Sequence, residues 1–516
     1  MADGKAKNIV GTTFTRLNKL REGHNFSFIP REVGKVISVS AGVVKVSGLP
    51  NVGYEEILKF PDELFGIAFN IDEQEIGVVI LGDVSNLKTG DEVERTGRVM
   101  DIPVGNSLIG RVIDPLGKPL DDQKPLIANK RLPIQRSATP IMDRSAVTVP
   151  LQTGLKVIDA LIPIGRGQRE LILGDRQTGK TAIAVDTIIN QKDKDVICIY
   201  CAIGQRASST AKVIANLRER GAMSYTIVMV TEGNNSPGLQ YIAPYAATSM
   251  AEYFMQEGKD VLVVYDDLTN HARAYRELSL LLRRPPGREA FPGDIFYIHS
   301  RLLERSTHLS KELGGGSLTA LPIVETEAQN ISAYIPTNLI SITDGQIYLS
   351  PKLFELGILP AVDVGRSVSR VGGKAQLPAY HSITGDLKLA FSQFEELETF
   401  ARFGSHMDEN TKKIIEHGKR IRACLKQKEL HPMAVEAQIL ILLALKEGVF
   451  DTIPLDKIEA AEEALLNSAA ELADDLISRL NSNEVLNEED RKYLVEFAQH
   501  TLEGLQEKTE NKPGQE

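Results

Sequence analysis

A glycine-bounded loop restricts what this chain can fold into more than any other stretch of its sequence. Residues 174–181 follow the pattern G-x-x-x-x-G-K-T, between an apolar run at residues 171–173 and a helix-like run at residues 182–185. Strand, loop and helix in this order form a phosphate cradle, because glycine lets the backbone approach an anion and the loop N–H groups point at it. The loop consists of Gly174, Asp175, Arg176, Gln177, Thr178, Gly179, Lys180 and Thr181.

The same pattern predicts the ligand. Lys180 would reach the β- and γ-phosphates of a nucleotide, and the hydroxyl of Thr181 would ligate Mg²⁺. We therefore expect ATP or ADP with Mg²⁺ as the bound species. Whether the nucleotide is also hydrolysed depends on residues outside the loop.

The composition is that of a soluble globular protein, with 42% hydrophobic and 25% charged residues among 516. The net charge of −10 argues against a protein that mainly wraps nucleic acid, since such a protein needs a basic face. No apolar run approaches the ~18 residues of a membrane span, and we expect no secretory signal. Any membrane role is expected to come through partners.

Three cysteines are too few for a disulfide framework. Cys198 and Cys201 have C-x-x-C spacing, but they lie in the apolar run of residues 196–201. Positions three apart on a strand face opposite sides, so we expect buried small side chains rather than a redox or zinc site.

Short apolar segments separated by glycines and polar turns fill residues 30–97. They recur about every ten residues, a rhythm typical of a small antiparallel β-barrel. The expected strands are residues 34–40, 42–46, 56–60, 76–81 and 91–93.

Residues 98–380 alternate short, continuous apolar runs with helical segments. Strands buried on both faces read this way, so we expect a parallel sheet flanked by helices, with ligands at the carboxyl ends of the strands. A hairpin turn is expected at residues 343–346. The strands expected after the phosphate loop are residues 196–201, 225–230, 261–265, 295–298 and 321–324.

The periodicity becomes helical from residue 381 to the end. Residues 435–445 predict a buried helix, and later apolar residues at helical spacing predict one face of a long amphipathic helix. The residues of that face are Ile458, Ala461, Leu465, Leu472, Leu476 and Leu480. We therefore expect an arm at residues 1–29, a barrel at 30–97, a nucleotide-binding domain at 98–380 and a helical domain at 381–516.

Two further positions bear on the nucleotide chemistry. Asp266 directly follows a buried strand, where a carboxylate can hold Mg²⁺ or its water shell. ATPases of this layout usually place a glutamate after the next strand to activate water, but this chain has Gln205 there. A neutral amide takes no proton, so the site is expected to bind ATP and keep it, although glutamine positions water in some GTPases.

Residues 360–370 form a loop with two serines and two arginines. An arginine presented from a loop suits the charge that develops on a transferring phosphoryl group. If this chain's own site lacks a base, the target of Arg370 would lie on a neighbouring subunit. Spacing alone leaves a structural salt bridge equally open.

Several motifs together resemble the α subunits of F-type ATP synthases over residues 30 to beyond 440. They are residues 163–170, the loop at 174–181, Tyr265-Asp266-Asp267-Leu268, and residues 280–289, 360–370 and 400–405. The resemblance implies a β-barrel crown, a RecA-like nucleotide domain and a helical C-terminal domain.

The resemblance also implies a role. Three α subunits would alternate with three β subunits around a γ shaft, with the δ subunit and peripheral stalk as further partners. The α site would bind Mg-ATP without turnover, with Gln427 near the base, and Arg370 would be the arginine finger of the adjacent β site. Such a chain would lie on the cytoplasmic face of a bacterial inner membrane, attached only through the ion-conducting sector.

Some positions depart from the usual pattern of that family. Leu359 stands where an arginine is common, and Glu429 stands where a second glutamine is usual after Gln427. Arg366, with Asp363 before it, and the short N-terminal arm are also unusual. These departures suggest the hypothesis of a divergent second copy, with a different coupling ion such as Na⁺ in place of H⁺.

Two other functions share this fold. An autonomous catalytic ATPase should carry a carboxylate where Gln205 stands. A hexameric RNA translocase should carry aromatic and arginine side chains on its barrel, where this chain has valine, isoleucine and glutamate.

Overall fold

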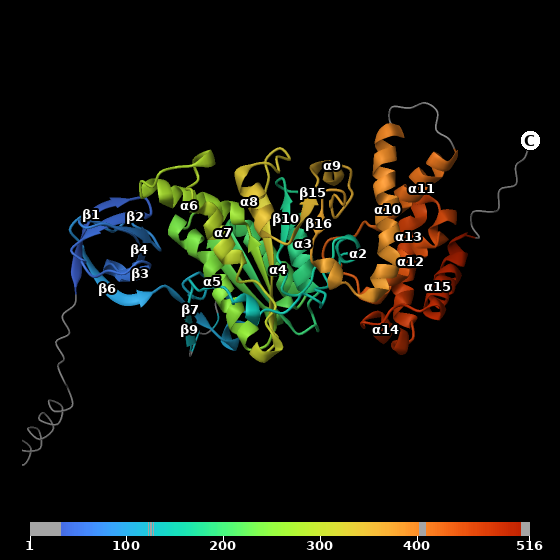
Figure 1. Cartoon of the computed structure of the whole chain (residues 1–516), viewed down its shortest axis with the longest axis horizontal. Helices are drawn as coiled ribbons and strands as arrows, with labels where there is room; N and C mark the ends of the chain where they lie inside the picture. The colour runs from blue at the N-terminus through green and yellow to red at the C-terminus, as the bar shows by residue number, and fades with distance from the viewer. Residues whose placement is uncertain are drawn as a thin grey trace, which may run out of the picture.

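Three structural units follow one another along the long axis of the molecule (Figure 1). The computed structural model describes residues 32–401, except 122, 124, 125, 127 and 129, and residues 409–506. The arm expected at residues 1–29 and most of the motif at residues 400–405 lie outside this description. Within it, none of the helices has the length and apolarity that a membrane crossing requires.

The N-terminal unit is the predicted barrel. Six antiparallel strands close in the order β1-β2-β5-β4-β3-β6, around a core of their own that includes Val44, Val78 and Leu58. One strand, β4, went unpredicted, and β6 is longer than expected. The strands are β1 Val33–Ser40, β2 Val43–Ser47, β3 Glu56–Lys59, β4 Phe65–Ile71, β5 Ile76–Ile80 and β6 Glu92–Val99.

The central unit contains the predicted parallel sheet. Eight strands lie in the order β16-β15-β10-β14-β13-β11-β12-β8, and all neighbours are parallel except β15 and β16. A two-stranded ribbon, β7 Asp101–Val104 with β9 Lys130–Pro133, lies outside it. The sheet strands are β8 Val112–Ile113, β10 Glu170–Gly174, β11 Val196–Gln205, β12 Thr226–Glu232, β13 Asp260–Asp266, β14 Ser317–Glu325, β15 Gly345–Leu349 and β16 Val368–Ser369.

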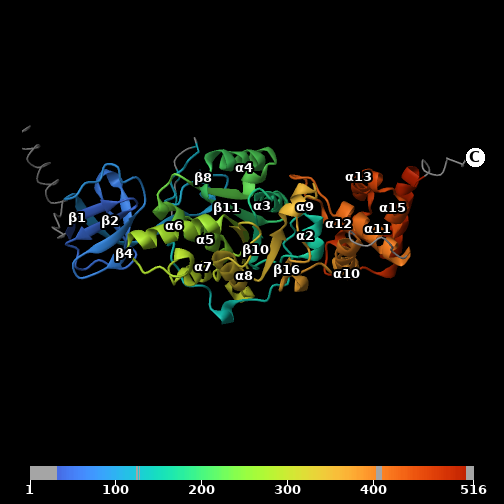
Figure 2. The ribbon, with the colours of Figure 1, turned by 90° about the horizontal axis from the view of Figure 1, so that it is seen from above.

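Helices cover both faces of the sheet, as Figure 2 shows from above. One face packs on α3 and α4, and the other on α5, α6, α7 and α8. The helices of this unit are α2 Lys156–Leu161, α3 Lys180–Ile189, α4 Ala207–Glu219, α5 Pro237–Gln256, α6 Leu268–Leu281, α7 Ile295–Leu303, α8 Tyr334–Ile342 and α9 Pro351–Glu355.

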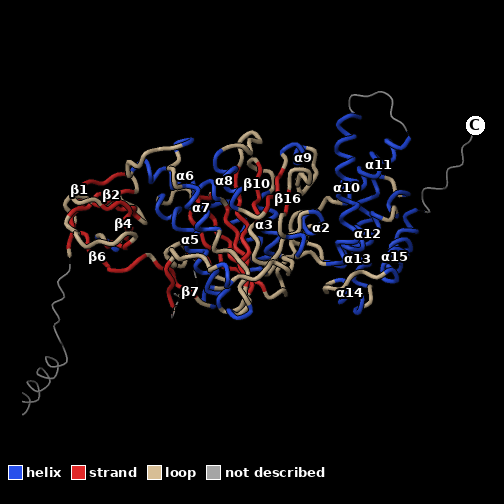
Figure 3. The backbone as a smooth tube through the Cα atoms, viewed as in Figure 1, coloured by secondary structure: helices blue, strands red, loops and turns tan. Residues whose placement is uncertain are grey.

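The C-terminal unit is helical (Figure 3). Its core continues the core on the α3 face of the sheet, and α12 is its most buried helix. The helices are α10 Pro378–Ala401, α11 Glu409–Cys424, α12 Val435–Lys446, α13 Ile458–Ser468, α14 Asp474–Leu480 and α15 Glu488–Gln506.

The two cysteines of the C-x-x-C spacing lie on opposite faces of β11. Cys198 packs in the core that contains α3, and Cys201 packs in the core that contains α5. Both are fully buried, and burial raises the pKa of each thiol. They are therefore inert core residues, as the strand period predicted.

The strand expected at residues 295–298 was wrong, because these residues begin helix α7. The buried positions of this segment are Ile295, Ile298, His299, Leu302 and Leu303. Their spacing of three and four residues is helical, which the first four residues alone do not reveal.

Two further expectations need correction. Residues 343–346 do not close a hairpin: Thr343 and Asp344 join α8 to β15, which begins at Gly345. The Thr343 hydroxyl donates to the carbonyl of Leu339 at the end of α8. The long amphipathic helix is broken at residues 469–473, and the next helix begins with Asp474 and Asp475. Acidic residues in a first turn favour a helix start, because they complement the helix dipole. The predicted apolar face is buried in both pieces.

Candidate nucleotide site

The phosphate loop connects β10 to α3, as the sequence predicted. Gly179 has φ +94°, a left-handed conformation that glycine adopts without strain, and it precedes the first turn of α3. A Cβ on Gly174 would lie 2.8 Å from the carbonyl oxygen of Leu349 and 2.9 Å from Thr178 Oγ1. A side chain at position 174 would therefore force the loop away from Leu349 on β15.

Lys180 lies inside the loop. Its Nζ donates to the carbonyl oxygens of Gly174 at 2.9 Å and Asp175 at 2.6 Å, and the side chain is buried. Burial lowers its pKa, while several carboxylates nearby act against that shift. An ammonium group already directed into the loop suits a phosphate ligand, which would supply stronger, charged acceptors than carbonyls.

Thr181 and Asp266 come together from different elements, α3 and the end of β13. Thr181 Oγ1 donates to Asp266 Oδ2 at 2.8 Å, and the hydroxyl of Tyr200 donates to the same oxygen at 2.7 Å. Two ligand oxygens at adjacent corners of an octahedral Mg²⁺ site lie ~3 Å apart, since each bond is ~2.1 Å long. The observed separation fits that arrangement.

The carboxylates at this edge are deeply buried. Burial raises the pKa of Asp266, and burial together with the charge of Asp266 raises the pKa of Asp267 to about 7. A divalent cation would offset this accumulation of negative charge. Among the described residues no group of three or more His, Cys, Asp or Glu side chains could hold a metal, so Mg²⁺ here would depend on Thr181, Asp266 and the ligand's own oxygens.

Gln205 ends β11, next to β13, and points at both aspartates. Its Nε2 lies 3.1 Å from Asp266 Oδ1 and 3.2 Å from Asp267 Oδ2, to which it donates. The side chain at this position is therefore a donor to the metal-side carboxylates, whereas a general base must accept a proton.

The remaining loop residues stabilise the loop from outside. Asp175 Oδ1 accepts from Thr326 Oγ1 at 2.6 Å, and Thr178 Oγ1 donates to the carbonyl of Asp175 at 2.8 Å. Arg176 Nε donates to Glu325 Oε2 at 3.0 Å, which ties that carboxylate to an arginine. Gln177 has φ +61°, a conformation uncommon for a non-glycine residue.

Gln427 does not lie in the loop. Its amide donates to the carbonyls of Gly154 at 2.7 Å and His431 at 2.8 Å, and accepts from Lys156 N at 3.0 Å. Its backbone N–H donates to the carbonyl of Leu359, so Gln427 lies beside the position where an arginine is common. Its role near the base stays a prediction.

Arg370 lies at the opposite edge of the sheet from the loop. Ser369 pairs with Gly345, and Gly345 pairs with Glu170, the first residue of β10. Gly174 is the last residue of the same strand, about 13 Å away at ~3.3 Å per residue. Arg370 follows Ser369, so it belongs to the amino ends of the parallel strands.

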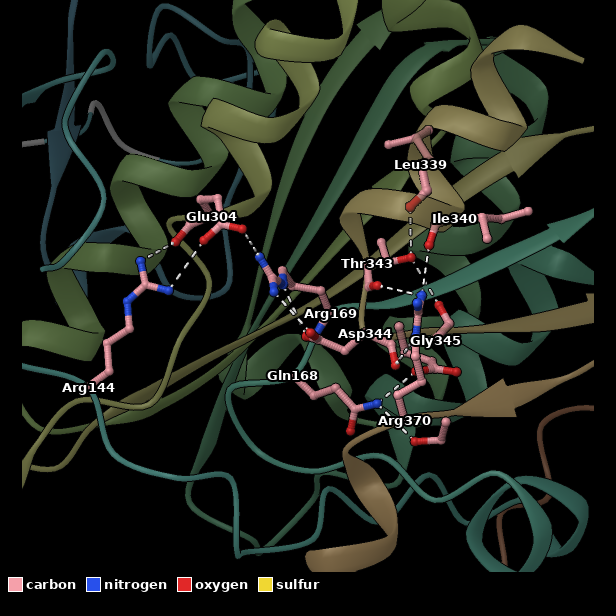
Figure 4. Close-up of polar contacts among 12 residues, drawn as sticks. Arg144, Gln168, Arg169, Glu304, Leu339, Ile340, Thr343, Asp344, Gly345 and Arg370 are labelled. Carbon is pink, nitrogen blue, oxygen red and sulfur yellow. Dashed lines mark hydrogen bonds and ion pairs between the residues drawn. The ribbon is translucent and has the colours of Figure 1, made fainter. Parts of the chain in front are cut away.

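The guanidinium of Arg370 is exposed and held by main-chain oxygens (Figure 4). Its Nη2 donates to the carbonyls of Ile340 and Thr343, both at 2.8 Å, at the end of α8. Helix C-termini attract cations because their last carbonyls lack partners.

Arg366, the other arginine of this loop, serves a local purpose. Its guanidinium lies over the Tyr348 ring at 5.3 Å from the centroid, and its backbone N–H donates to Asp363 Oδ1 at 3.0 Å. Asp363 and Arg366, the two departures in this loop, therefore make local contacts with each other and with Tyr348.

Three contributors to these edges escaped the sequence analysis. Tyr200 lies inside an apolar run, and its hydroxyl, which needs a hydrogen-bond partner when buried, was the signal that could have pointed to Asp266. Glu325 ends the run of residues 321–324 as Asp266 ends its own strand, a parallel that could have been used. Arg169 lies in the motif at residues 163–170, but its contacts depend on strand pairing.

Three family models match the sequence, and all belong to the ATP synthase alpha/beta family. The model of the β-barrel domain matches residues 29–97, and the model of the nucleotide-binding domain matches residues 154–369. The model of the C-terminal domain matches residues 376–501. The three matches follow the order of the three structural units.

Curated relatives match over nearly the whole chain. "ATP synthase subunit alpha 1" of Marinomonas sp. (strain MWYL1) is 69% identical over 95% of this chain and 96% of its own length. "ATP synthase subunit alpha 2" of Albidiferax ferrireducens is 67% identical over 97% of this chain and 94% of its own length. "ATP synthase subunit alpha 2" of Polaromonas naphthalenivorans is 67% identical over 96% of this chain and 95% of its own length. The chain belongs to the ATP synthase alpha/beta family, among its alpha subunits.

Proposed function

We propose that this chain is the non-catalytic, nucleotide-binding α subunit of a rotary, ion-translocating F-type ATP synthase. It holds Mg-ATP or Mg-ADP in its own loop and supplies Arg370 to the catalytic site of an adjacent β subunit. The observation that carries this proposal is that the phosphate loop and Arg370 lie at opposite edges of one sheet.

Binding at the carboxyl edge rests on three groups. Lys180 meets the phosphates, while Thr181 and Asp266 hold Mg²⁺, which supplies charge neutralisation between the phosphate oxygens when bound. The glycines of the loop keep the space in which backbone N–H groups contact the anion.

Retention of the nucleotide rests on Gln205. Its amide donates to Asp266 and Asp267, so it orients the carboxylates of the magnesium site. Glu325, a carboxylate at the same edge, is paired with Arg176. Gln205, at the position expected for the base, takes no proton from water, which supports a site that binds and keeps its nucleotide.

The finger role of Arg370 rests on its position. A side chain at the amino ends of the strands cannot reach a phosphate bound at the carboxyl ends of the same strands. Because Arg370 is exposed, it would be accessible to a nucleotide that a neighbouring subunit of the ring presents.

The partners follow from this assignment. Three copies alternate with three β subunits around a γ shaft, and the δ subunit and peripheral stalk complete the assembly. The complex lies on the cytoplasmic face of a bacterial inner membrane, which this chain meets only through the ion-conducting sector. The relatives bear the numbers alpha 1 and alpha 2, which supports the hypothesis of a second copy; pumping measured with Na⁺ depleted tests a change of coupling ion.

The experiment that tests the function is Arg370→Ala in the assembled complex. Turnover should fall by about 10³–10⁵, the range that an arginine acting on phosphoryl transfer from another subunit contributes. The affinity of the isolated chain for Mg-ATP should stay within about twofold of wild type, because Arg370 lies far from the chain's own loop.

Arg366→Ala is the matched control. This arginine is four residues away in the same loop and is also exposed, and it packs on Tyr348, so its loss should leave turnover close to wild type. A complex that keeps full turnover without Arg370 would refute the finger role. Weaker nucleotide binding by the Arg370→Ala variant would mean that this arginine serves its own site.

A further inference from the structure

Arg169, the residue just before β10, forms a two-pronged contact with Asp344, the residue just before β15. Arg169 Nε donates to Asp344 Oδ2 at 3.0 Å, and Nη2 donates to Oδ1 at 2.9 Å. The backbone joins them as well, since Arg169 N donates to Asp344 Oδ2 and Asp344 N donates to the carbonyl of Arg169 at 2.8 Å. Four contacts therefore fix one residue against the other.

Asp344 in turn holds Arg370. The backbone N–H of Arg370 donates to the carbonyl of Asp344 at 2.9 Å, and Nε of its guanidinium lies 3.4 Å from the same oxygen. The carbonyl of Thr343, one residue earlier, accepts from Nη2. The Arg370 guanidinium is thus held by the carbonyls of Ile340 and Thr343 at the end of α8, together with Asp344, which Arg169 holds in place.

The contact between Arg169 and Asp344 is itself anchored from behind. Arg169 Nη1 donates to Glu304, and Arg144 donates to the same carboxylate at 3.3 Å, as Figure 4 shows. Although burial works against its charge, hydrogen bonds to Asp344 and Glu304 raise the pKa of Arg169 above its ordinary value. A cavity of about 420 Å³ lies over these groups, lined by Arg169, Glu304, Asp344 and Arg370 and rimmed by the exposed Phe296 and Ser341.

A second contact steadies the residue before the finger. Gln168 Nε2 donates to Ser369 Oγ at 3.0 Å, and Ser369 Oγ donates to the carbonyl of Pro163 at 2.6 Å. Gly345 has no room for a side chain, since a Cβ there would lie 2.2 Å from the carbonyl of Val368. The residues just before β10 therefore fix the finger loop through both the residue before Arg370 and the carbonyl that holds it.

We propose that Arg169 is a positioning residue for the reaction at the neighbouring β site, which it serves by holding Asp344 and, through it, the guanidinium of Arg370. This inference rests on the proposed function, because it assigns Arg169 to the same finger. Arg169 does not touch the nucleotide. It restricts where the finger can point, and loss of orientation alone can reduce a rate by about 10²-fold.

The test compares kcat and KM for Mg-ATP in assembled complexes. Arg169→Ala should lower kcat about 10- to 100-fold, leave KM unchanged within about twofold, and leave Mg-ATP binding by this chain's own loop unchanged. Arg169→Lys keeps the charge but loses the two-pronged contact, so its kcat should fall several-fold less. If the complex with Arg169→Ala fails to assemble, the complex with Arg169→Lys tests the proposal. A wild-type kcat in that complex overturns it.

Arg111→Ala is the control for the loss of any buried ion pair. Arg111 makes the same two-pronged contact with Asp121, at 2.8 and 2.6 Å, beside β8 at the other end of the sheet order. It should keep kcat near wild type. An equal loss of kcat in this control would assign the Arg169 effect to general weakening of the fold and overturn the positioning role.

The double variant separates this inference from the function beneath it. The kcat of the double variant Arg169→Ala with Arg370→Ala should be no lower than that of Arg370→Ala alone. Once the Arg370 guanidinium is absent, Arg169 has no side chain left to orient. Losses that multiply would overturn the positioning role. If the single variant Arg169→Ala has normal kcat while the single variant Arg370→Ala is inactive, only this inference is overturned. If Arg370→Ala keeps full turnover, the proposed function is overturned.

Discussion

The two edges of the central sheet hold their charged groups in different ways. At the carboxyl edge, Lys180 and Asp266 are 7% and 3% exposed. Burial lowers the pKa of Lys180 and raises the pKa of Asp266, so it favours the neutral form of both groups. At the amino edge, Arg144, Glu304, Arg169 and Asp344 form a series of paired charges that ends at the exposed Arg370.

The difference teaches what each edge is for. Buried groups whose charged forms are disfavoured gain most from an ionic ligand, which supports the proposal that a nucleotide and Mg²⁺ bind at the carboxyl edge. Paired charges that hold one exposed arginine gain nothing from a ligand within the same chain. This arrangement supports the proposal that Arg370 acts on a neighbouring subunit.

Lys180→Ala should have the largest effect at the carboxyl edge. We expect the affinity of the chain for Mg-ATP to fall about 10²-fold, because a charge-assisted hydrogen bond to phosphate contributes ~1.5–3 kcal/mol. Turnover of the complex should stay within about threefold, since the proposed function places the reaction on the adjacent β subunit. Equilibrium binding with the isolated chain and steady-state turnover with the complex measure the two quantities.

Lys192→Ala is the matched control, because Lys192 is exposed and follows the same helix α3. It should change neither quantity. If Lys180→Ala stopped turnover of the complex while the chain still bound nucleotide normally, the assignment of nucleotide binding to the carboxyl edge would be contradicted.

The carboxyl edge was predictable because its signals are local. Eight consecutive residues define the loop, and Asp266 and Gln205 each end an apolar run whose neighbours in the sheet follow from the parallel order. The fold class was predictable for the same reason. The run at residues 295–298 failed because four apolar residues do not distinguish a strand from the first turn of a helix.

The amino edge was hidden from the sequence because its contacts are distant. Arg169 and Asp344 are 175 residues apart, and they meet only because β10 pairs with β15 in one register. The site of Arg370 could be inferred from a resemblance, but the backbone that orients it could not. Gln427 shows the same limit, since its partners Gly154 and Lys156 lie more than 270 residues earlier.

Asp186→Asn should have a smaller effect, at the far end of the helix that carries Lys180. Burial, with a smaller contribution from the charge of Glu429, raises the pKa of Asp186 to about 7. A raised pKa means that the folded chain binds the proton more tightly, so its stabilising contribution is complete below pH ~4 and is lost as the pH rises through ~7. The variant keeps the bond from Leu430 N and should be more stable than wild type by about 1–3 kcal/mol at pH 8, but not at pH 4.

Chemical denaturation of the isolated chain at both pH values measures this difference. Asp193→Asn, at an exposed position shortly after α3, is the control and should show no such dependence. An equal gain at pH 4 and pH 8 would mean that the Asp186 carboxyl does not titrate between them.

The most direct test of the account measures binding and hydrolysis in one sample of the isolated chain. We predict saturable binding of Mg-ATP that Lys180→Ala weakens, with no steady release of phosphate, because Gln205 takes no proton from water. Steady phosphate release that Lys180→Ala abolishes would show that the carboxyl edge is itself a catalytic site, and would contradict the account.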